Sequence, residues 1–210
     1  MNGSNFHRVL RVVGDLSRHP HLCGPYLRAL PLWRKEPLDY KLPWYSYTAI
    51  NFLNTYLKKD MTVFEWGCGG STLFFAERCK HVFCVESCDN WADRIAETLK
   101  LKSITNVTVL RYSLDGIMDL VSFEKSEYCC CVRGIDADIY AIDGYEAEVQ
   151  FRHQCFMTVE EKIKPSNLIV VDDSWRYEGI RNNHHAEKMK TFKSVGPCRY
   201  GVTSTDVYFY

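Results

Sequence analysis

Short apolar runs and longer amphipathic segments alternate along most of the chain. The apolar runs cover residues 61–66, 81–87, 106–112, 137–144 and 167–174, and the segments between them space apolar residues three and four apart over 71–79, 89–102, 146–164 and 179–192. Runs of the first kind predict buried strands, and segments of the second kind predict helices. Strands that alternate with helices indicate βαβ units and a mainly parallel sheet.

The C-terminal residues form two strand-like runs, 198–204 and 206–210, around a short turn. We expect these runs to add an antiparallel hairpin to an edge of the sheet. The predicted fold class is therefore α/β, a Rossmann-like three-layer sandwich. Its sheet is mostly parallel and seven-stranded, with an antiparallel C-terminal hairpin strand.

The N-terminal part has a different pattern. Residues 6–18 place Phe6, Val9, Leu10, Val13 and Leu16 at helical spacing, which predicts one amphipathic helix. Five prolines follow between residues 19 and 43, so this stretch is expected to form short helical pieces and turns. We predict a helical appendage over 1–43 and a main domain over 44–210. The appendage would shape or cover a pocket, or contact a second copy of the chain.

Composition narrows the function classes. The chain has 210 residues, and its 26 basic residues balance its 26 acidic ones, which gives no support for a nucleic-acid partner. No apolar run approaches the roughly 20 residues of a membrane span. Ten cysteines occur without the paired spacing of a zinc site, and three of them are consecutive at 129–131. We expect reduced thiols in a soluble cytoplasmic protein.

The stretch VFEWGCGGSTLFF, residues 63–75, runs from a predicted strand into a cluster of glycines. Glycines after the first strand of such a sheet let the backbone approach a ligand closely. A phosphate-binding P-loop would need a lysine after the glycines, and none is present. A dinucleotide fingerprint would need a glycine where Thr72 stands, so that interpretation is weakened.

Acidic residues at two strand ends discriminate further. Glu65 precedes the first glycine, where a carboxylate would repel a pyrophosphate and attract an ammonium group. Glu86 ends the next strand, at the distance that suits the two hydroxyls of an adenosine ribose. Together these acids favour a cofactor that carries an amine and an adenosine, with no phosphate at the turn. The alternative is that both are solvated loop acids.

At these residues the sequence resembles the class I S-adenosylmethionine-dependent methyltransferases. The stretch FEWGCGG of this chain matches their first motif, acid-x-Gly-x-Gly. The resemblance implies that Glu65 and the loop Gly67, Cys68 and Gly69 hold the methionine part, and that Glu86 holds the ribose. An acid or small polar residue after the third strand, here Ser113 or Asp115, would meet the adenine. We also count Asp143 among the candidate cofactor-binding residues. The third glycine of the motif falls on Ser71.

Two further strands end in acids, at Asp143 and at the pair Asp172 and Asp173. If the strands are neighbours, the carboxylates lie in one crevice and raise one another's pKa unless a cation lies between them. A divalent ion such as Mg²⁺ would resolve the repulsion and would acidify a bound hydroxyl. The alternative is metal-free, because Asp172 could cap the segment that follows it.

These acids resemble the metal ligands of catechol O-methyltransferase and of the macrocin-type sugar O-methyltransferases. The resemblance implies a metal at Asp143, Asp172 and Asp173. The catalytic lysine of the catechol enzymes corresponds here to Glu146, so the base must come from elsewhere. The candidates are Asp143, His153, His184 and His185, and our candidate catalytic residues are Asp143, Asp172 and His153. The alternative for each histidine is a packing or surface role.

Aromatic and basic residues beside these strands could border a substrate pocket. Trp175, Arg176, Tyr177 and Arg181 follow the acidic pair and could hold a sugar, an aryl ring or an anionic group, or could serve packing alone. Trp44, Tyr45 and Tyr47 form a second cluster, either at the rim of a pocket or in the core.

The predicted function is methyl transfer from S-adenosylmethionine to a small molecule, with a hydroxyl as the expected acceptor. Magnesium and a homodimer stay open, and we expect neither a nucleic-acid nor a membrane partner. A nicotinamide-dependent oxidoreductase on a Rossmann fold is the second hypothesis, and a non-catalytic cofactor-binding module is the third.

Overall fold

The computed structural model describes residues 3–30, 37–117, 119–146 and 150–210. Within them seven strands form one sheet in the order β3-β2-β1-β4-β5-β7-β6. The strands are β1 (Thr62–Trp66), β2 (His81–Glu86), β3 (Val107–Arg111), β4 (Ile139–Ile142), β5 (Leu168–Val171), β6 (Lys188–Val195) and β7 (Val202–Phe209). The first five are parallel, and β7 is antiparallel to both β5 and β6. The predicted mostly parallel sheet with an antiparallel C-terminal hairpin is confirmed.

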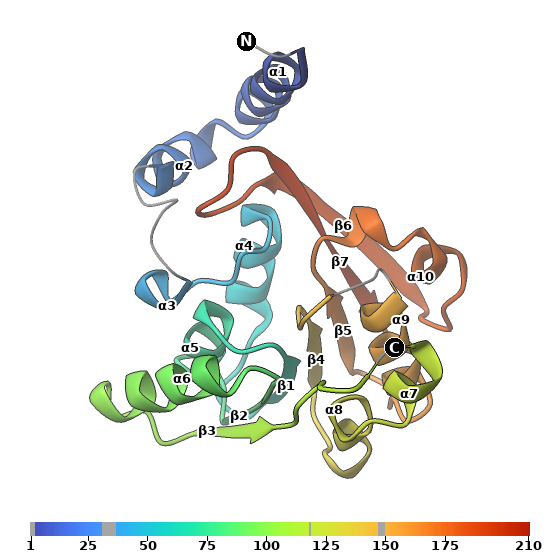
Figure 1. Ribbon diagram of the computed structural model, residues 1–210. Helices are drawn as coiled ribbons and strands as arrows, with labels where there is room; N and C mark the ends of the chain where they lie inside the picture. The colour runs from blue at the N-terminus through green and yellow to red at the C-terminus, as the bar shows by residue number, and fades with distance from the viewer. Residues whose placement is uncertain (1–2, 31–36, 118, 147–149) are drawn as a thin grey trace.

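Helices cover both faces of the sheet (Figure 1). One face carries α4 (Tyr47–Tyr56), α5 (Gly70–Ala76) and α6 (Asp89–Leu101), and the other carries α7 (Leu120–Glu124), α8 (Glu127–Cys130), α9 (Gln150–Glu160) and α10 (Glu178–Asn182). Short 3₁₀ turns lie at Cys131–Gly134 and Ser174–Arg176. The arrangement is the predicted three-layer sandwich.

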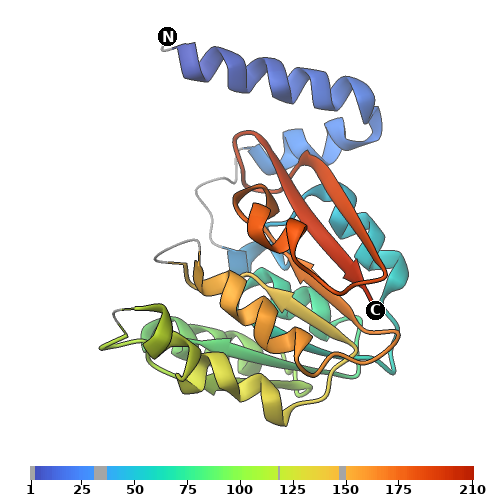
Figure 2. The same ribbon diagram turned by 90° about the vertical axis from the view of Figure 1, so that its right-hand side faces the viewer.

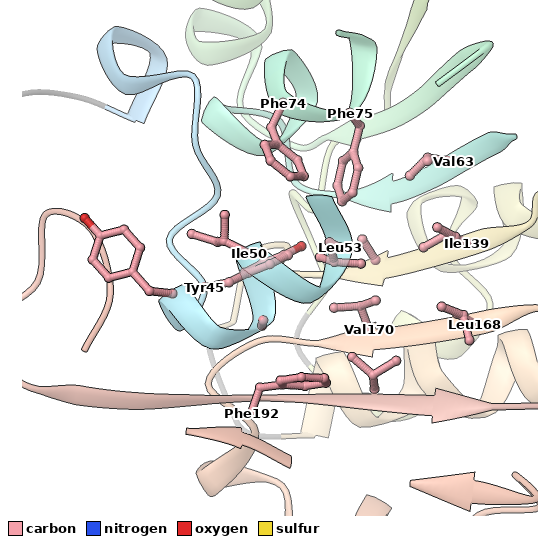
Figure 3. Packing of buried hydrophobic residues seen from close by; sticks show 14 of the residues in the cluster. Tyr45, Ile50, Leu53, Val63, Phe74, Phe75, Ile139, Leu168, Val170 and Phe192 are labelled. Atoms are coloured by element: carbon pink, nitrogen blue, oxygen red, sulfur yellow. The ribbon is translucent and has the colours of Figure 1, made fainter. Parts of the chain in front are cut away.

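Strand residues alternate between the two hydrophobic cores on either side of the sheet. Val63 packs in the core beneath α4 and α5, whereas its neighbour Phe64 packs in the core beneath α7, α8 and α9. The period of two in a strand sends successive side chains to opposite faces. Figure 3 shows the first core, where Leu53 of α4 lies against the sheet near Ile139 and Val170.

The C-terminal region corrects two predictions. The predicted helix over 179–192 is confirmed only up to Asn182, where α10 ends, and is wrong beyond it, because β6 begins at Lys188. The predicted strand pair is displaced, since residues 198–201 lie in the turn between β6 and β7, and β7 is a single strand. Residues 188–195 pair with β7 along their whole length; Phe192 is buried between two exposed residues, and Ser194 and Val195 are buried as well. This pairing overrides the helical spacing of the apolar residues.

The N-terminal residues form α1 (Gly3–Arg18), a 3₁₀ turn (Pro20–Leu22), α2 (Cys23–Ala29) and α3 (Pro37–Tyr40). Figure 2 shows α1 lying across the end of the β6–β7 hairpin. Asp15 fixes the contact, because its buried carboxylate accepts a hydrogen bond from the backbone N–H of Val195 at 2.8 Å. Leu22 and Tyr26 lie in the same core as Val63. The boundary between residues 43 and 44 stays a prediction.

The apolar stripe of α1 faces outward. Phe6, Val9, Leu10 and Val13 are 48–59% exposed, while Val12 and Leu16 pack against the core. Among the described residues, no helix is both long enough and apolar enough to span a membrane. All ten cysteines are free thiols, and five of them are buried.

Candidate functional site

The glycine cluster forms a tight turn between β1 and α5. Gly67 has φ +90°, a conformation that side chains disfavour, and a Cβ at this position would lie only 2.8 Å from the carbonyl oxygen of Asp143. The N–H of Gly67 donates to the carbonyl oxygen of Val85 at 2.9 Å. The turn therefore brings the ends of β1, β2 and β4 close together, and it needs glycine to do so.

Glu65 stabilises this turn through a hydrogen-bond chain on the side away from the cavity. Its carboxylate is 1% exposed and accepts a hydrogen bond from the hydroxyl of Thr72, whose oxygen accepts from the N–H of Gly69 at 2.9 Å. Burial raises the pKa of Glu65 to about 8, against the opposing effect of the hydrogen bonds from Thr72 and Ser71. Glu65 does not line the cavity described below. Thr72, the residue that weakened the dinucleotide interpretation, is the link between this acid and the loop.

Glu86 ends β2 with its carboxylate at the same turn. One carboxylate oxygen accepts from the N–H groups of Ser87 and Cys88, both at 2.9 Å, and the other accepts from the N–H of Cys68 at 3.4 Å. These bonds fix the direction of the side chain. Unlike Glu65, Glu86 lines the cavity.

A cavity of about 490 Å³ opens at the carboxyl ends of β1, β2, β4 and β5. Its lining includes residues 67–71, Glu86, Asp143, Arg152 and Arg199. The volume lies within the range of small-molecule pockets. The position is the topological switch point of the sheet, because the chain passes from β1 to β2 and β3 on one side and returns to β4 and β5 on the other.

The structure brings most of the predicted cofactor-binding residues together. Gly67, Cys68, Gly69, Glu86 and Asp143 all line this cavity. It does not bring Ser113 or Asp115 there. Ser113 is exposed, and its hydroxyl accepts a hydrogen bond from the N–H of Asp115 at 2.9 Å.

Two arginines lie among the three aspartates. Arg152 of α9 contacts a carboxylate oxygen of Asp143 at 3.1 Å, and its Nε donates to the carbonyl oxygen of Gly144 at 2.9 Å. Arg199, from the turn between β6 and β7, contacts Asp172 at 3.2 Å and Asp173 at 2.5 Å. The fully buried carboxylate of Asp172 also accepts from the hydroxyl of Thr205 at 2.8 Å.

The three carboxyls differ in their electrostatics. Burial, followed by the negative charge of Asp143, raises the pKa of Asp172 well above its ordinary value. Burial also raises the pKa of Asp143, against the opposing charges of Arg152 and Arg199. For Asp173, burial would raise the pKa, but the hydrogen bonds and charge of Arg199 lower it overall. The positive charge that the acids require comes from the two guanidinium groups.

The magnesium prediction at Asp143, Asp172 and Asp173 therefore gains no support from the geometry. The described residues contain no group of three or more His, Cys, Asp or Glu side chains that could hold a metal ion. Sequence reasoning missed Arg152 and Arg199 as partners of these acids. The only signal was that a buried acid needs a partner, which does not say where in the sequence the partner stands.

The predicted bases separate in the structure. Asp143 lines the cavity, but His153 does not; its ring packs against Gly179 at the start of α10. The ring of His184 stands edge-on to Tyr208, with centroids 5.0 Å apart, and His185 contacts Glu160 at 3.2 Å. Asp143 is the one candidate base that the cavity can present to a ligand.

The two aromatic clusters also divide. Trp44 lines the cavity and is 38% exposed, whereas Tyr45 and Tyr47 are buried in the core. Tyr177 is buried, and its hydroxyl donates to Glu146 at 2.8 Å. Arg176 lines the cavity, while Arg181 binds Asp206 at 2.6 Å.

No protein-family model and no curated protein matches this sequence. Solved structures do share its fold. Precorrin 8w decarboxylase from Methanobacterium thermoautotrophicum is 16% identical with a TM-score of 0.56, and the alignment covers 78% of this chain and 89% of that one. A candidate methyltransferase from Streptococcus mutans, solved in complex with SAH, is 11% identical with a TM-score of 0.54, covering 76% and 94%.

A third similar structure is precorrin-6y C5,15-methyltransferase from Geobacter metallireducens. It is 15% identical with a TM-score of 0.51, and the alignment covers 78% of this chain and 87% of that one. At these identities the likeness is one of architecture. The chain has the Rossmann-like fold of the class I methyltransferases.

Proposed function

We propose that this protein is an S-adenosylmethionine-dependent methyltransferase that acts on a hydroxyl group of a small molecule. The observation that carries the proposal is the cavity at the switch point, where the glycine turn and the carboxylate of Glu86 face the same space. The shared fold supports it, because one protein with this fold holds SAH.

The residues present fit this cofactor. Positions 67–71 include three glycines, which leave the backbone open to close approach. Backbone N–H groups take about three of the four acceptor sites of the Glu86 carboxylate, and the contact of Oε2 with Cys68 is long at 3.4 Å, so Oε2 can still accept from a ribose hydroxyl. Glu65, held by Thr72, keeps the loop in place. When bound, S-adenosylmethionine supplies a methyl group activated by a sulfonium, so that no covalent enzyme intermediate is required.

The protein has to align the acceptor, exclude water and take up the hydroxyl proton. We assign the proton to Asp143, the one candidate base that lines the cavity. Its raised pKa brings the carboxylate closer to the pH at which a general base works efficiently. Arg152, 3.1 Å away, holds the carboxylate in position.

Calorimetric titration with SAH tests the proposal. We expect Glu86→Ala to weaken SAH binding by roughly 5-fold to 150-fold, which corresponds to about 1–3 kcal/mol for the lost hydrogen bonds. Glu97→Ala, which removes an exposed acid of α6 away from the cavity, is the matched control and should bind SAH normally. Tighter binding of NADH than of SAH by the unmodified protein would instead support the oxidoreductase. Normal SAH binding without methyl transfer to any hydroxyl acceptor would support the third hypothesis, a non-catalytic cofactor-binding module.

A further inference from the structure

A second and larger cavity, of about 990 Å³, lies between α1 and the β6–β7 hairpin. Its walls come from parts of the chain far apart in sequence: α1, the segment before α4, the 3₁₀ turn after β5, α10, and the hairpin with its turn. Figure 2 shows α1 passing over the end of the hairpin. Asp15 anchors the C-terminal half of α1 through Val195, so its N-terminal half extends over the cavity.

Positive charge dominates this lining. Five cationic residues and one acid line it: Arg8, Arg11, Arg181, Lys193, Arg199 and Asp173. Asp206 and the aspartate pair already neutralise Arg181 and Arg199. Within the described part of the chain, Arg8, Arg11 and Lys193 take part in no ion pair. Three unneutralised cations in one concave space make an anion-binding site.

Three aromatic side chains share the cavity with these cations. Trp44, Trp175 and Tyr200 line it and are 38%, 64% and 58% exposed. Such a large exposed aromatic surface offers apolar faces on which a planar ring can stack. The cavity thus combines an anion-binding region with an aromatic one.

The two cavities meet. Trp44, Asp173 and Arg199 line both of them. A molecule in the larger cavity would therefore border the cavity that holds the glycine turn, Glu86 and Asp143.

We propose that the larger cavity binds the methyl acceptor, and that this acceptor is a small aromatic molecule carrying a carboxylate or phosphate group. The inference rests on the proposed function of the smaller cavity. Arg8, Arg11 and Lys193 bind the anionic group, and the aromatic side chains contact the ring. The acceptor hydroxyl is directed toward the junction at Asp173 and Arg199.

The distribution of charge favours a small anion over a nucleic acid. Proteins that bind nucleic acid commonly contact six to ten phosphates through extended basic surfaces. Here the whole chain has equal numbers of acidic and basic residues, and Arg8, Arg11 and Lys193 line a single cavity. That number of cations suits a single anionic group.

Binding of three matched probes tests the inference: 1-naphthyl phosphate, 1-naphthoate and the neutral 1-naphthol, titrated calorimetrically into the full chain saturated with SAH. We expect both anions to bind at least tenfold more tightly than 1-naphthol. The triple variant Arg8→Gln, Arg11→Gln, Lys193→Gln should lose this preference and leave the affinity for 1-naphthol unchanged. The triple variant Lys80→Gln, Lys100→Gln, Lys102→Gln removes three exposed cations outside the cavity; it is the charge-matched control and should behave as the unmodified protein.

The substituted residues are exposed, so the triple variant should fold, and its SAH affinity reports this directly. Equal binding of anionic and neutral probes by the unmodified protein would overturn the inference, as would an anion preference that survives in the triple variant. Competition with an RNA oligonucleotide tests the alternative. If the RNA displaces the anionic probes and binds more tightly than they do, the three cations belong to a nucleic-acid site instead.

The same titrations separate this inference from the proposed function. Failure of the unmodified protein to bind SAH, with the anion preference intact in SAH-free protein, would refute the cofactor and leave the anion site. Normal SAH binding without the anion preference would refute the acceptor class alone. Trp175→Ala should lower the affinity for all three probes by the same factor. A loss of affinity for the two anions alone would contradict the assigned contact between Trp175 and the ring.

Discussion

The crevice at the carboxyl edge of the sheet has two halves that are built differently. At β1 and β2, the residues that shape the glycine turn are close in sequence, and Glu65, Gly69 and Thr72 lie within eight positions. At β4 and β5, the acids depend on Arg152 and Arg199, and the contact between Asp172 and Arg199 spans 27 positions. The first half is a local backbone motif. The second half is a balance of charges that forms only when the chain has folded.

The largest expected effect comes from breaking the second half. Arg199→Met should lower the free energy of unfolding by about 3–5 kcal/mol at pH 8, because it leaves the buried carboxylate of Asp172 without its cation. The loss of unfolding free energy should be smaller at pH 5, because protonation of Asp172 removes its unpaired charge. Urea unfolding at both pH values measures it. Arg111→Met, which breaks the exposed pair with Asp93, should cost less than about 1 kcal/mol, and equal losses would contradict the comparison.

The pH dependence of Glu65 tests the first half. With a pKa of about 8 in the folded protein, against an ordinary value of 4.5, the folded protein holds a proton that the unfolded chain releases. The free energy of unfolding therefore falls as pH rises between these two values. Glu65→Gln should match the unmodified protein at pH 5 and exceed its stability by about 3 kcal/mol at pH 8.

Urea unfolding over this pH range measures the difference, with Glu97→Gln as the exposed control. An unchanged slope of stability against pH in Glu65→Gln would mean that Glu65 is already ionised in the folded protein.

Gly67→Ala probes the backbone of the turn. We expect it to cost roughly 2–3 kcal/mol of stability, from the positive φ together with the contact to the carbonyl oxygen of Asp143. Gly116 also has positive φ, at +78°, but no atom lies within 4 Å of a Cβ built there. Gly116→Ala should therefore cost less stability. The difference between the two variants measures the contribution of the close contact between position 67 and the carbonyl oxygen of Asp143. Thermal unfolding measures both variants, and equal costs would remove that approach as the reason for Gly67.

The smallest effect is expected at His153. Its ring packs against Gly179 and does not line the cavity, so His153→Asn should change the affinity for SAH by less than about twofold and the stability by less than about 1 kcal/mol. Asp143→Asn, at the cavity, should lower the rate of methyl transfer. A comparable rate loss in both variants would return His153 to the list of bases.

Some residues of the candidate site could be predicted from the sequence and others could not, for a physical reason. The glycine turn and the position of Glu86 could be predicted because the turn follows β1, Glu86 ends β2, and parallel strands carry their ends to one edge. Glu65, predicted to face the cofactor, lies within β1 and is buried outside the cavity lining. His153, a predicted base, does not line the cavity, and the sequence could not show this because the helical position of a histidine does not say which neighbour it faces. Arg152, its neighbour on α9, was overlooked although it borders the cavity. A helix rotates successive residues by about 100°, so one position decides between the cavity and α10.

By itself the sequence determined the strand–helix alternation, the central strands and the glycine turn, because these depend on periodicity and on local backbone conformation. Tertiary structure decided the remainder. Residues 188–195 became β6 because β7 was available to pair with them. Leu53 of α4 and Phe6 of α1 are both apolar residues of helices, yet Leu53 is buried and Phe6 is exposed. Pairing, burial and charge compensation depend on which distant surfaces meet, and local pattern does not encode that.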